Sequence, residues 1–390
     1  MPEAHALLSA SAAARWLNCP PSARLCAEIP DEPTPYAAEG TLAHEMCEVK
    51  LEPFVTAVPK RTTASKLAGL KKHELYQPEM DGYTDEYVDY IKKTALGLPG
   101  KAHIAVEQKV NYSGYAPEGF GTADCVIVCK DRMHIIDFKY GKGVPVSAED
   151  NPQLKLYALG ALEAYGMFYP INAVSLHIVQ PRLKNFSVWE TDVRYIRGWG
   201  ESIKTVARQA FNGEGDFSSG DHCRFCKLKA TCRKRAEDNL KLAEYEFAKP
   251  LSRAKDGEPT LSDDEVGEAL SLAVNLKRWA EDLEGYALSA ALSGKKIKGW
   301  KAVEGRTTRT FTDLEKVFQT LEANGFPRET FYERKPLPFT KIEAIVGKAD
   351  FQKLLEHLIA RSQGKPALVP ESDKRPEFVP ATTAQEDFKQ

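Results

Sequence analysis

The sequence contains no apolar run that approaches the length of a membrane-spanning helix. Its first five residues, Met1-Pro2-Glu3-Ala4-His5, lack the basic start and the apolar segment of a secretory signal. We therefore expect a cytoplasmic protein with no membrane partner. Internal repeats and low-complexity runs are absent, and so is the Gly-x4-Gly-Lys-Ser/Thr motif of nucleotide-binding P-loops.

The sequence also lacks a strong charge of either sign, because its formal net charge is −2 at pH 7. This balance neither favours nor excludes a nucleic-acid partner, since basic groups can gather in a groove while acidic metal ligands offset them in the sum. The apolar and charged fractions, 43% and 28%, are typical of a globular protein. A chain of 390 residues can form two or three domains.

A disulfide framework is not expected from the eight cysteines, because the chain is expected in the cytosol and the cysteines are spread unevenly. Cys125 and Cys129 alternate with apolar residues in a strand pattern, so we expect them in the core. Cys26 falls in a loop or at a helix end. The spacing of Cys19, Cys223, Cys226 and Cys232 is more informative.

Three cysteines lie together in a polar, basic stretch, as Cys223-x2-Cys226-x5-Cys232, and Cys19-Pro20 stands alone about 200 residues upstream. A Cys-x2-Cys pair fits either zinc or an iron–sulfur cluster. His222 as the fourth ligand would favour zinc, whereas Cys19 would give all-cysteine ligation and favour a [4Fe–4S] cluster joining the two ends of one domain. The spacing alone leaves both alternatives open.

Between these cysteines lies an acidic group formed by Asp124 and the run Asp137-Phe138-Lys139. Asp124 begins one predicted strand and Asp137 nears the end of the next, so both carboxylates can project at one end of a sheet. Lys139 falls on the same face as Asp137, because side chains alternate with a period of two. Mg²⁺ or Mn²⁺ takes oxygen ligands and keeps several waters, so two carboxylates and an open face suit it. The pattern favours metal-dependent hydrolysis of a phosphodiester.

Three further residues are candidates for this site. His44 lies in a helical pattern and is a candidate metal ligand. Gln153 and Tyr157 are one helical turn apart, where they could contact substrate phosphates or brace Lys139. By spacing alone, a polar residue at a helix start and a core tyrosine are equally good interpretations of these two.

The periodicity predicts a mixed α/β (α+β) fold. A short first helix is followed by a helix capped by Thr41, then by an irregular polar segment over 55–80. A strand meander and a fourth strand come next. The expected helices are Leu7–Asn18, the segment after Thr41, 81–95, Asn151–Tyr165 and Asp192–Phe211, and the expected strands are His103–Val110, Ala123–Cys129, Met133–Lys139 and Ala173–Gln180.

The character of the chain changes after about residue 246. Pro250–Pro259 is a linker candidate, and Ser262-Asp263-Asp264-Glu265 is a capping box that opens a long helix to about Leu292. A hairpin is expected over Gly299–Phe311. We therefore predict a domain over 1–246, a mainly helical region of unassigned role over 261–365, and a disordered tail over 366–390.

The order of these motifs resembles the RecB-type branch of the PD-(D/E)XK nucleases, and within it the iron–sulfur members found among CRISPR adaptation nucleases and AddB-type helicase–nuclease subunits. The whole chain also resembles an uncharacterised phage and prophage family of this type. Each motif alone is weak, but six in the family order are specific. In this chain they are Ser11…Trp16-Leu17-Asn18-Cys19-Pro20, Gly40-Thr41-Leu42-Ala43-His44, Gly121-Thr122-Ala123-Asp124, Asp137-Phe138-Lys139, Gln153-Leu154-Lys155-Leu156-Tyr157 and the triplet from Cys223.

The resemblance implies a restriction-endonuclease-like sheet flanked by helices. It also implies roles for particular residues, except that Glu107 in the first strand receives none and 247–390 match no nuclease motif. The implied metal ligands are His44, Asp124 and Asp137, the catalytic lysine is Lys139, the supporting residues are Gln153 and Tyr157, and the [4Fe–4S] ligands are Cys19, Cys223, Cys226 and Cys232.

The expected function is that of a metal-dependent deoxyribonuclease acting on DNA ends or single strands, in phage recombination, replication or repair. A helicase or recombination protein is the expected partner, and the host cytoplasm the location if the chain is phage-encoded. The alternative is a non-catalytic DNA-binding or scaffold protein on the same fold, with a structural zinc or iron–sulfur site.

Overall fold

The computed structural model describes residues 6–30, 35–56, 59–248, 263–303 and 314–323. The chain divides into two compact units, Met1–Val303 and Glu304–Gln390. No described helix is both long and apolar enough to cross a membrane. The strands are β1 His103–Asn111, β2 Phe120–Cys129, β3 Arg132–Phe138, β4 Ala173–Gln180 and β5 Asn185–Asp192. The α-helices of the first unit are α1 Ala13–Asn18, α2 Ser22–Ala27, α3 Pro35–Val55, α4 Lys60–Leu70, α5 Glu79–Leu96, α6 Pro152–Tyr165, α7 Val193–Asn212, α8 Arg233–Ala248 and α9 Asp263–Leu292, with 3₁₀ turns η1 Ala10–Ala12, η2 Pro181–Leu183 and η3 Asp221–Phe225; the second unit contributes α10 Leu314–Ala323.

The five strands form one mixed sheet in the order β1-β2-β3-β4-β5. Each neighbouring pair is antiparallel except β3 and β4, which run parallel. A parallel connection requires a crossover, and α6 supplies it by covering one face of the sheet between the two strands. This crossover brings the start of α6 to the end of β3, where the acidic motif lies.

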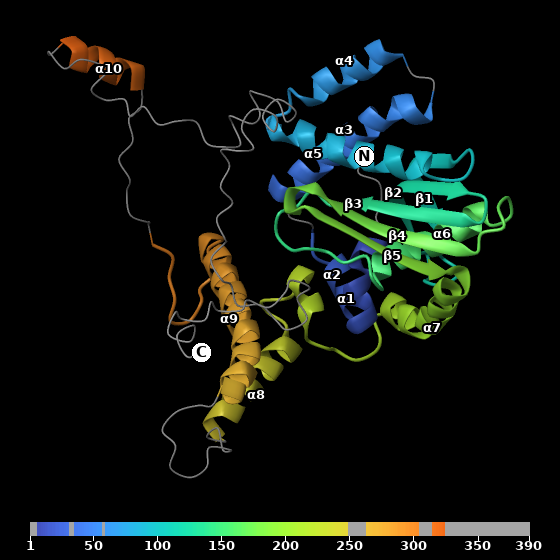
Figure 1. The fold of residues 1–390 in the computed structure, drawn as a ribbon. Helices are drawn as coiled ribbons and strands as arrows, with labels where there is room; N and C mark the ends of the chain where they lie inside the picture. Colours follow the sequence, from blue (N-terminus) through green and yellow to red (C-terminus); the bar gives the residue numbers. More distant parts are fainter. Residues whose placement is uncertain (1–5, 31–34, 57–58, 249–262, 304–313, 324–390) are drawn as a thin grey trace, which may run out of the picture. The chain divides into compact units, whose positions relative to one another are not determined.

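Two hydrophobic cores lie on opposite faces of the sheet. The alternation of β2 shows this directly, because Val126 and Val128 belong to the core shared with η1, α1, α6 and α7, whereas Cys125 and Ile127 belong to the core shared with α3 and α5. Figure 1 shows the corresponding three layers, with α3, α4 and α5 on one side of the sheet and α1, α2 and α7 on the other. The sheet is therefore the middle layer of the unit.

The N-terminal segment is anchored in the first of these cores. Trp16 is fully buried and donates a hydrogen bond from Nε1 to the Ser9 carbonyl oxygen at 3.0 Å. Tyr112, also fully buried, donates from its hydroxyl to the Leu8 carbonyl oxygen at 3.2 Å. An indole and a phenol buried this deeply need a polar partner, and both find it in this one turn of backbone. The start of the chain is thereby fixed against the loop after β1.

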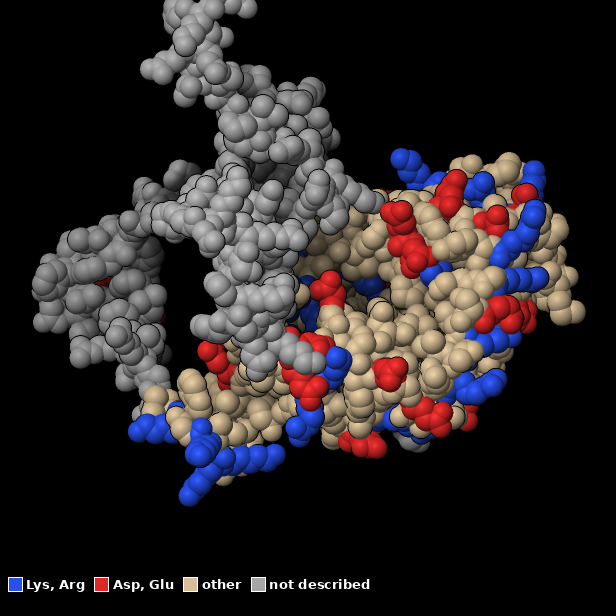
Figure 2. Space-filling model, turned by 90° about the horizontal axis from the view of Figure 1, so that it is seen from below, with Lys and Arg blue, Asp and Glu red and all other residues tan. Residues whose placement is uncertain are grey.

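The helix α9 is connected to the cysteine-rich segment by ion pairs. Asp282 lies 2.8 Å from Lys229 Nζ and 2.6 Å from an Arg235 guanidinium nitrogen. Arg278 lies 3.4 Å from Asp221 in η3. Elsewhere the surface charges alternate: over the face drawn in Figure 2, basic and acidic side chains are interspersed, in keeping with the net charge of −2.

The structure confirms the predicted mixed α/β class, the first four strands and most helices. It differs in several segments, and the helices α2 and α8 were not predicted. The interval 55–80, predicted to be irregular, contains α4, and β5 was not predicted at all. Thr41 is not a cap, because α3 begins at Pro35 and the Thr41 hydroxyl donates to the Ala37 carbonyl inside the helix. The linker candidate, most of the predicted hairpin and the predicted tail lie outside the described residues.

Close packing of α6 on β1 leaves no space for a side chain at Gly160. A Cβ there would lie 2.8 Å from Val110 Cβ and 3.1 Å from the backbone N and O of Asn111. We expect Gly160→Ala to lower the free energy of unfolding by about 1–3 kcal/mol through overpacking. Gly82 in α5 is the matched control, because nothing lies within 4 Å of its Cβ position. Gly82→Ala should raise the free energy by about 0.5–1 kcal/mol. Chemical denaturation measures both, and an equal effect of the two substitutions would contradict the packing.

Candidate functional site

The two predicted carboxylates occupy adjacent strands at the same end of the sheet. The β2–β3 ladder ends at the pair Cys125–Ile136, so the next two positions along it are Asp124 and Asp137. Asp124 Oδ2 accepts a hydrogen bond of 2.6 Å from the backbone N–H of Phe138, which fixes its side chain across the strand boundary. The site is thus built on paired strands rather than on loops, and strands hold side chains in precise positions.

Asp137 is 2% exposed and lies in a network with Lys139 and Gln153. Its Oδ1 accepts a hydrogen bond of 2.9 Å from Gln153 Nε2, and its Oδ2 lies 3.0 Å from Lys139 Nζ. The second contact is an ion pair that lacks hydrogen-bond geometry, so this buried oxygen keeps an unused lone pair. Lys139 Nζ also donates to Gln153 Oε1 at 3.1 Å. An oxygen that is buried, charged and incompletely satisfied fits a cation ligand.

Gln153 reaches this network because α6 begins beside it. The Asn151 side chain caps the helix by accepting from the backbone N–H groups of Gln153 and Leu154. Gln153 Nε2 lies 3.3 Å from the hydroxyl of Tyr157, which is 7% exposed. The structure therefore brings Asp137, Lys139, Gln153 and Tyr157 together, as the sequence predicted. Gln153 holds both the carboxylate and the ammonium group.

In this network the electrostatics stabilise the charged form of Lys139, whereas burial destabilises the ionised form of Asp137. Burial raises the pKa of Asp137 to about 6, although the charge of Lys139 opposes that rise. Burial lowers the pKa of Lys139, but the charges of Asp137 and Asp124 outweigh it and hold the pKa above its usual range. Lys139 is therefore an ammonium group at neutral pH. A further positive charge near Asp137 would relieve the cost of its ionised form.

A second group, consisting of His44, Glu107 and Asp124, lies beside the first. One ligand atom from each of the three side chains lies within 4.8 Å of the other two. His44 Nδ1 is 3.5 Å from Asp124 Oδ1. The pairs Val106–Cys125 and Gln108–Ala123 flank Glu107 and place it opposite Asp124 across the β1–β2 ladder. Asp124 thus belongs to both groups and joins them into one site.

The charges in this second group are mutually dependent. Burial lowers the pKa of His44, but the carboxylate of Asp124 raises it overall to about 9. Burial raises the pKa of Glu107 to about 7, and the charge of Asp124 adds to that rise. Burial also raises the pKa of Asp124, yet His44 more than compensates and lowers it overall. The proton on His44 thus offsets the negative charge of the neighbouring carboxylates. A divalent cation bound at the same place would offset that charge instead and would displace the proton.

Glu107 is the functional residue to which sequence reasoning gave no role. It has a φ of +49°, in the left-handed region that a glutamate rarely adopts. Four other non-glycine residues share this conformation, so the angle alone does not mark a site; Glu107 differs from them in lying inside a strand and next to Asp124 and His44. Neither the backbone angle nor the strand register can be read from the sequence. The available signal was a carboxylate in the middle of a strand that pairs with the strand of Asp124.

The four predicted cluster cysteines line one small pocket together with His222. Cys19 follows α1, Cys223 lies in η3, Cys226 follows it, and Cys232 precedes α8, so both ends of the sheet domain contribute. Hydrogen bonds with Cys19 and Cys223 raise the pKa of His222 to about 10. All four cysteines are free thiols.

The thiols of the cysteine pocket are spaced more widely than the ligand atoms of the acidic group. Among the described residues, the group His44, Glu107 and Asp124 is the one set of three candidate ligands within 4.8 Å of one another. Three cysteines of the pocket therefore do not come that close together. A tetrahedral zinc ion with bonds of about 2.3 Å would set its sulfurs about 3.8 Å apart.

Sequence reasoning placed Cys26 in a loop or at a helix end, which the structure confirms, but gave it no role. It lies in α2, and its Sγ is 3.7 Å from Sγ of Cys226. The hydrogen bond with Cys226 lowers the pKa of Cys26 to about 5, and the Arg15 charge contributes to this shift. A fifth cysteine thus contacts one predicted cluster ligand, Cys226, from outside the pocket.

Comparison with known proteins places the sequence in a family. The family described as "Protein of unknown function (DUF2800)" matches residues 5–376. The chain belongs to this family. Among solved structures, the chain titled "Crystal structure of SSO0001" is 14% identical over 55% of this chain and 93% of that chain, with a TM-score of 0.25. For this member of DUF2800, the functional argument therefore rests on the site itself.

If Glu107 is a cation ligand, its neutral isostere should weaken cation binding. We expect Glu107→Gln to raise the dissociation constant for Mn²⁺ about 10-fold or more, because a carboxylate is lost from a group of three. Isothermal titration calorimetry measures this. Glu45→Gln, an exposed position on α3, should leave the constant unchanged. Equal affinity in the two variants would remove Glu107 from the site.

Proposed function

We propose that this protein is a Mg²⁺- or Mn²⁺-dependent nuclease that hydrolyses DNA phosphodiester bonds. The observation that carries this proposal is the joined pair of groups around Asp124. It combines a histidine and two carboxylates within 4.8 Å with a buried aspartate–lysine pair on the adjacent strand. Such a donor set of hard oxygen ligands plus one imidazole suits a small divalent cation. A cation bound there would activate water and stabilise charge on the scissile phosphate.

The residues of the chain have separable tasks in this proposal. His44, Glu107, Asp124 and Asp137 would hold the cation, and the unused lone pair of Asp137 Oδ2 is available for it. Lys139 would orient the attacking water and offset the negative charge of the phosphate. Gln153 positions Lys139 and Asp137 at once through its two hydrogen bonds. Tyr157 in turn supports Gln153. Catalysis by such a site depends on positioning and on electrostatics.

For the cysteine pocket we propose a [4Fe–4S] cluster held by Cys19, Cys223, Cys226 and Cys232. The four side chains share a pocket, and ligation by four cysteines favours an iron–sulfur cluster over zinc. The proposed role is structural, because four ligands leave no coordination position open. A redox-sensing role has no comparable support. The biological setting we propose is DNA recombination, replication or repair in a phage, with a helicase or recombination protein as partner.

The catalytic assignment predicts that single substitutions abolish cleavage without unfolding the chain. Asp137→Ala and Lys139→Ala should each reduce the rate of DNA cleavage at least about 100-fold, because each removes a group that acts on the reacting atoms. The measurement is degradation of linear single- and double-stranded DNA with Mg²⁺ or Mn²⁺, with circular dichroism as the check on folding. Asp89→Ala, at an exposed position of α5, is the control and should keep full activity. Retained cleavage in both site variants would refute the assignment.

The cluster assignment predicts a spectroscopic difference between two cysteines that touch. Cys226→Ser should lose the broad absorption at about 400 nm and most of the roughly four irons per chain that an anaerobic preparation of the wild type should contain. Cys26→Ser is the matched control, since its sulfur lies 3.7 Å from Cys226 but outside the proposed ligand set. It should retain both colour and iron. A colourless wild-type protein containing zinc would favour the binding-scaffold alternative instead.

A further inference from the structure

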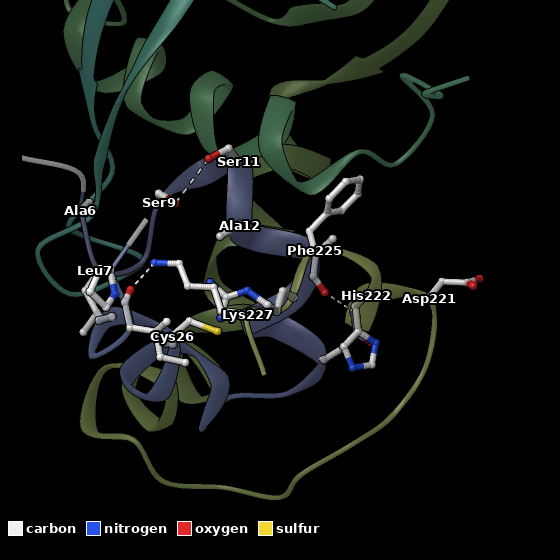
Figure 3. Close-up of a pocket in the computed structure, with 17 residues that line it drawn as sticks. Ala6, Leu7, Ser9, Ser11, Ala12, Cys26, Asp221, His222, Phe225 and Lys227 are labelled. Atoms are coloured by element: carbon white, nitrogen blue, oxygen red, sulfur yellow. Dashed lines mark hydrogen bonds between the residues drawn. The ribbon is translucent and has the colours of Figure 1, made fainter. Parts of the chain in front are cut away.

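A large pocket lined by the N-terminal segment and the cysteine-rich segment has no role in the proposed chemistry. It has a volume of about 1090 Å³ and lies between the first helical segment and the η3 turn. Figure 3 shows Ser9, Ser11 and Ala12 on the N-terminal segment, and His222, Phe225 and Lys227 on the opposite, cysteine-rich segment. The two ends of the sheet domain thus form its two walls.

The charged side chains of this pocket are mainly basic. Two permanent cations, Arg15 and Lys227, line it, and its one carboxylate is that of Asp221. The Asp221 side chain is 96% exposed and pairs with Arg278, which offsets its charge. The pocket therefore suits an anionic ligand.

An exposed aromatic ring lies at the edge of this basic pocket. Phe225 is 81% exposed, a large fraction for a phenylalanine, and the Arg224 guanidinium carbon lies 5.8 Å from its ring centroid. An aromatic face beside cations is the arrangement that binds unpaired nucleobases by stacking while the backbone phosphates contact the cations. A duplex does not offer a base face for stacking, except at its ends.

The pocket is connected to the candidate catalytic site through a short series of contacts. Leu8 follows Leu7 in the pocket wall, and its carbonyl oxygen accepts from Tyr112. The rings of Tyr112 and Tyr157 both approach Gly121, and Tyr157 contacts Gln153. Buried contacts thus join the wall of the pocket to Gln153 of the acidic site.

We propose that this pocket binds single-stranded DNA, with a base stacked on Phe225 and phosphates held by Arg15 and Lys227. The proposal rests on the proposed nuclease function and names its substrate as a single strand. It also gives the cysteine-rich segment a second task, because the turn that carries Cys223 presents the stacking ring. The cysteine site would then fix the position of a DNA contact as well as the two ends of the domain.

The test is fluorescence anisotropy with a labelled oligothymidylate in EDTA, where binding is measured without cleavage. Phe225→Ala should weaken binding at least about fivefold, the effect expected from loss of one stacked base. Phe168→Ala is the matched control, because Phe168 is 78% exposed but follows α6, away from the pocket residues. Its affinity should equal that of the wild type. A blunt duplex of the same length should bind more weakly and respond little to Phe225→Ala.

Removal of one charge gives an independent readout. Lys227→Gln should lower the slope of log affinity against log salt by about 0.7, the value for one phosphate contact on a single strand. Lys184→Gln, a substitution at a 69% exposed lysine, is the control and should leave the slope unchanged. Circular dichroism and the absorption spectrum of each variant check that the fold and the cysteine site are intact.

The outcomes separate this proposal from the proposed function. Wild-type cleavage of DNA combined with equal affinities of the Phe225 and Phe168 variants would overturn the pocket assignment alone. Weaker binding by Phe225→Ala in a protein that never cleaves DNA would support the pocket and refute the nuclease. Equal weakening of single-strand and duplex binding would overturn the single-strand assignment.

Discussion

The site depends on the electrostatic cost of placing two buried carboxylates on adjacent strands. Asp124 and Asp137 face each other just beyond the last pair of the β2–β3 ladder, where Asp137 is 2% exposed and the Asp124 side chain 13% exposed, so water cannot fully solvate either. Each neighbouring group reduces that cost. Lys139 supplies a positive charge, His44 a proton, and Gln153 and the Phe138 N–H supply hydrogen bonds. Such a group of charges is stable only when it is complete, because removal of one partner leaves another buried and unpaired.

The fold provides the positions at which these groups meet. The parallel pairing of β3 with β4 forces a crossover, and the first turn of the crossover helix carries Gln153, which hydrogen-bonds both Asp137 and Lys139. The antiparallel hairpins on the other side bring Glu107 opposite Asp124. His44 comes from the helical layer on the far face of the sheet. The acidic site is therefore a product of sheet order, with residues drawn from three strands and two helices.

Much of this arrangement could be predicted from the sequence, because strands of period two fix which side chains share a face. The positions of Asp124, Asp137 and Lys139 follow from that rule, and the helical spacing of Gln153 and Tyr157 from another. Glu107 could not be assigned, since its role depends on strand pairing and on a backbone angle that is strained for glutamate. The contact between Cys26 and Cys226 was equally inaccessible, because it joins segments about 200 residues apart. The edge strand β5 was missed because Phe186 and Val188 point outward, so its apolar residues do not mark a buried face.

The cysteine pocket has a consequence for biosynthesis. Its ligands come from both ends of the domain, and about 210 residues separate Cys19 from Cys232. At a synthesis rate of about 5–20 residues per second, Cys19 leaves the ribosome roughly 10–40 s before the last cysteine exists. The first thiol must therefore wait, exposed or sequestered, until the whole sheet has been made. Any metal centre assembled there is a late event, and a truncated nascent chain would carry a reactive cysteine without a site to hold it.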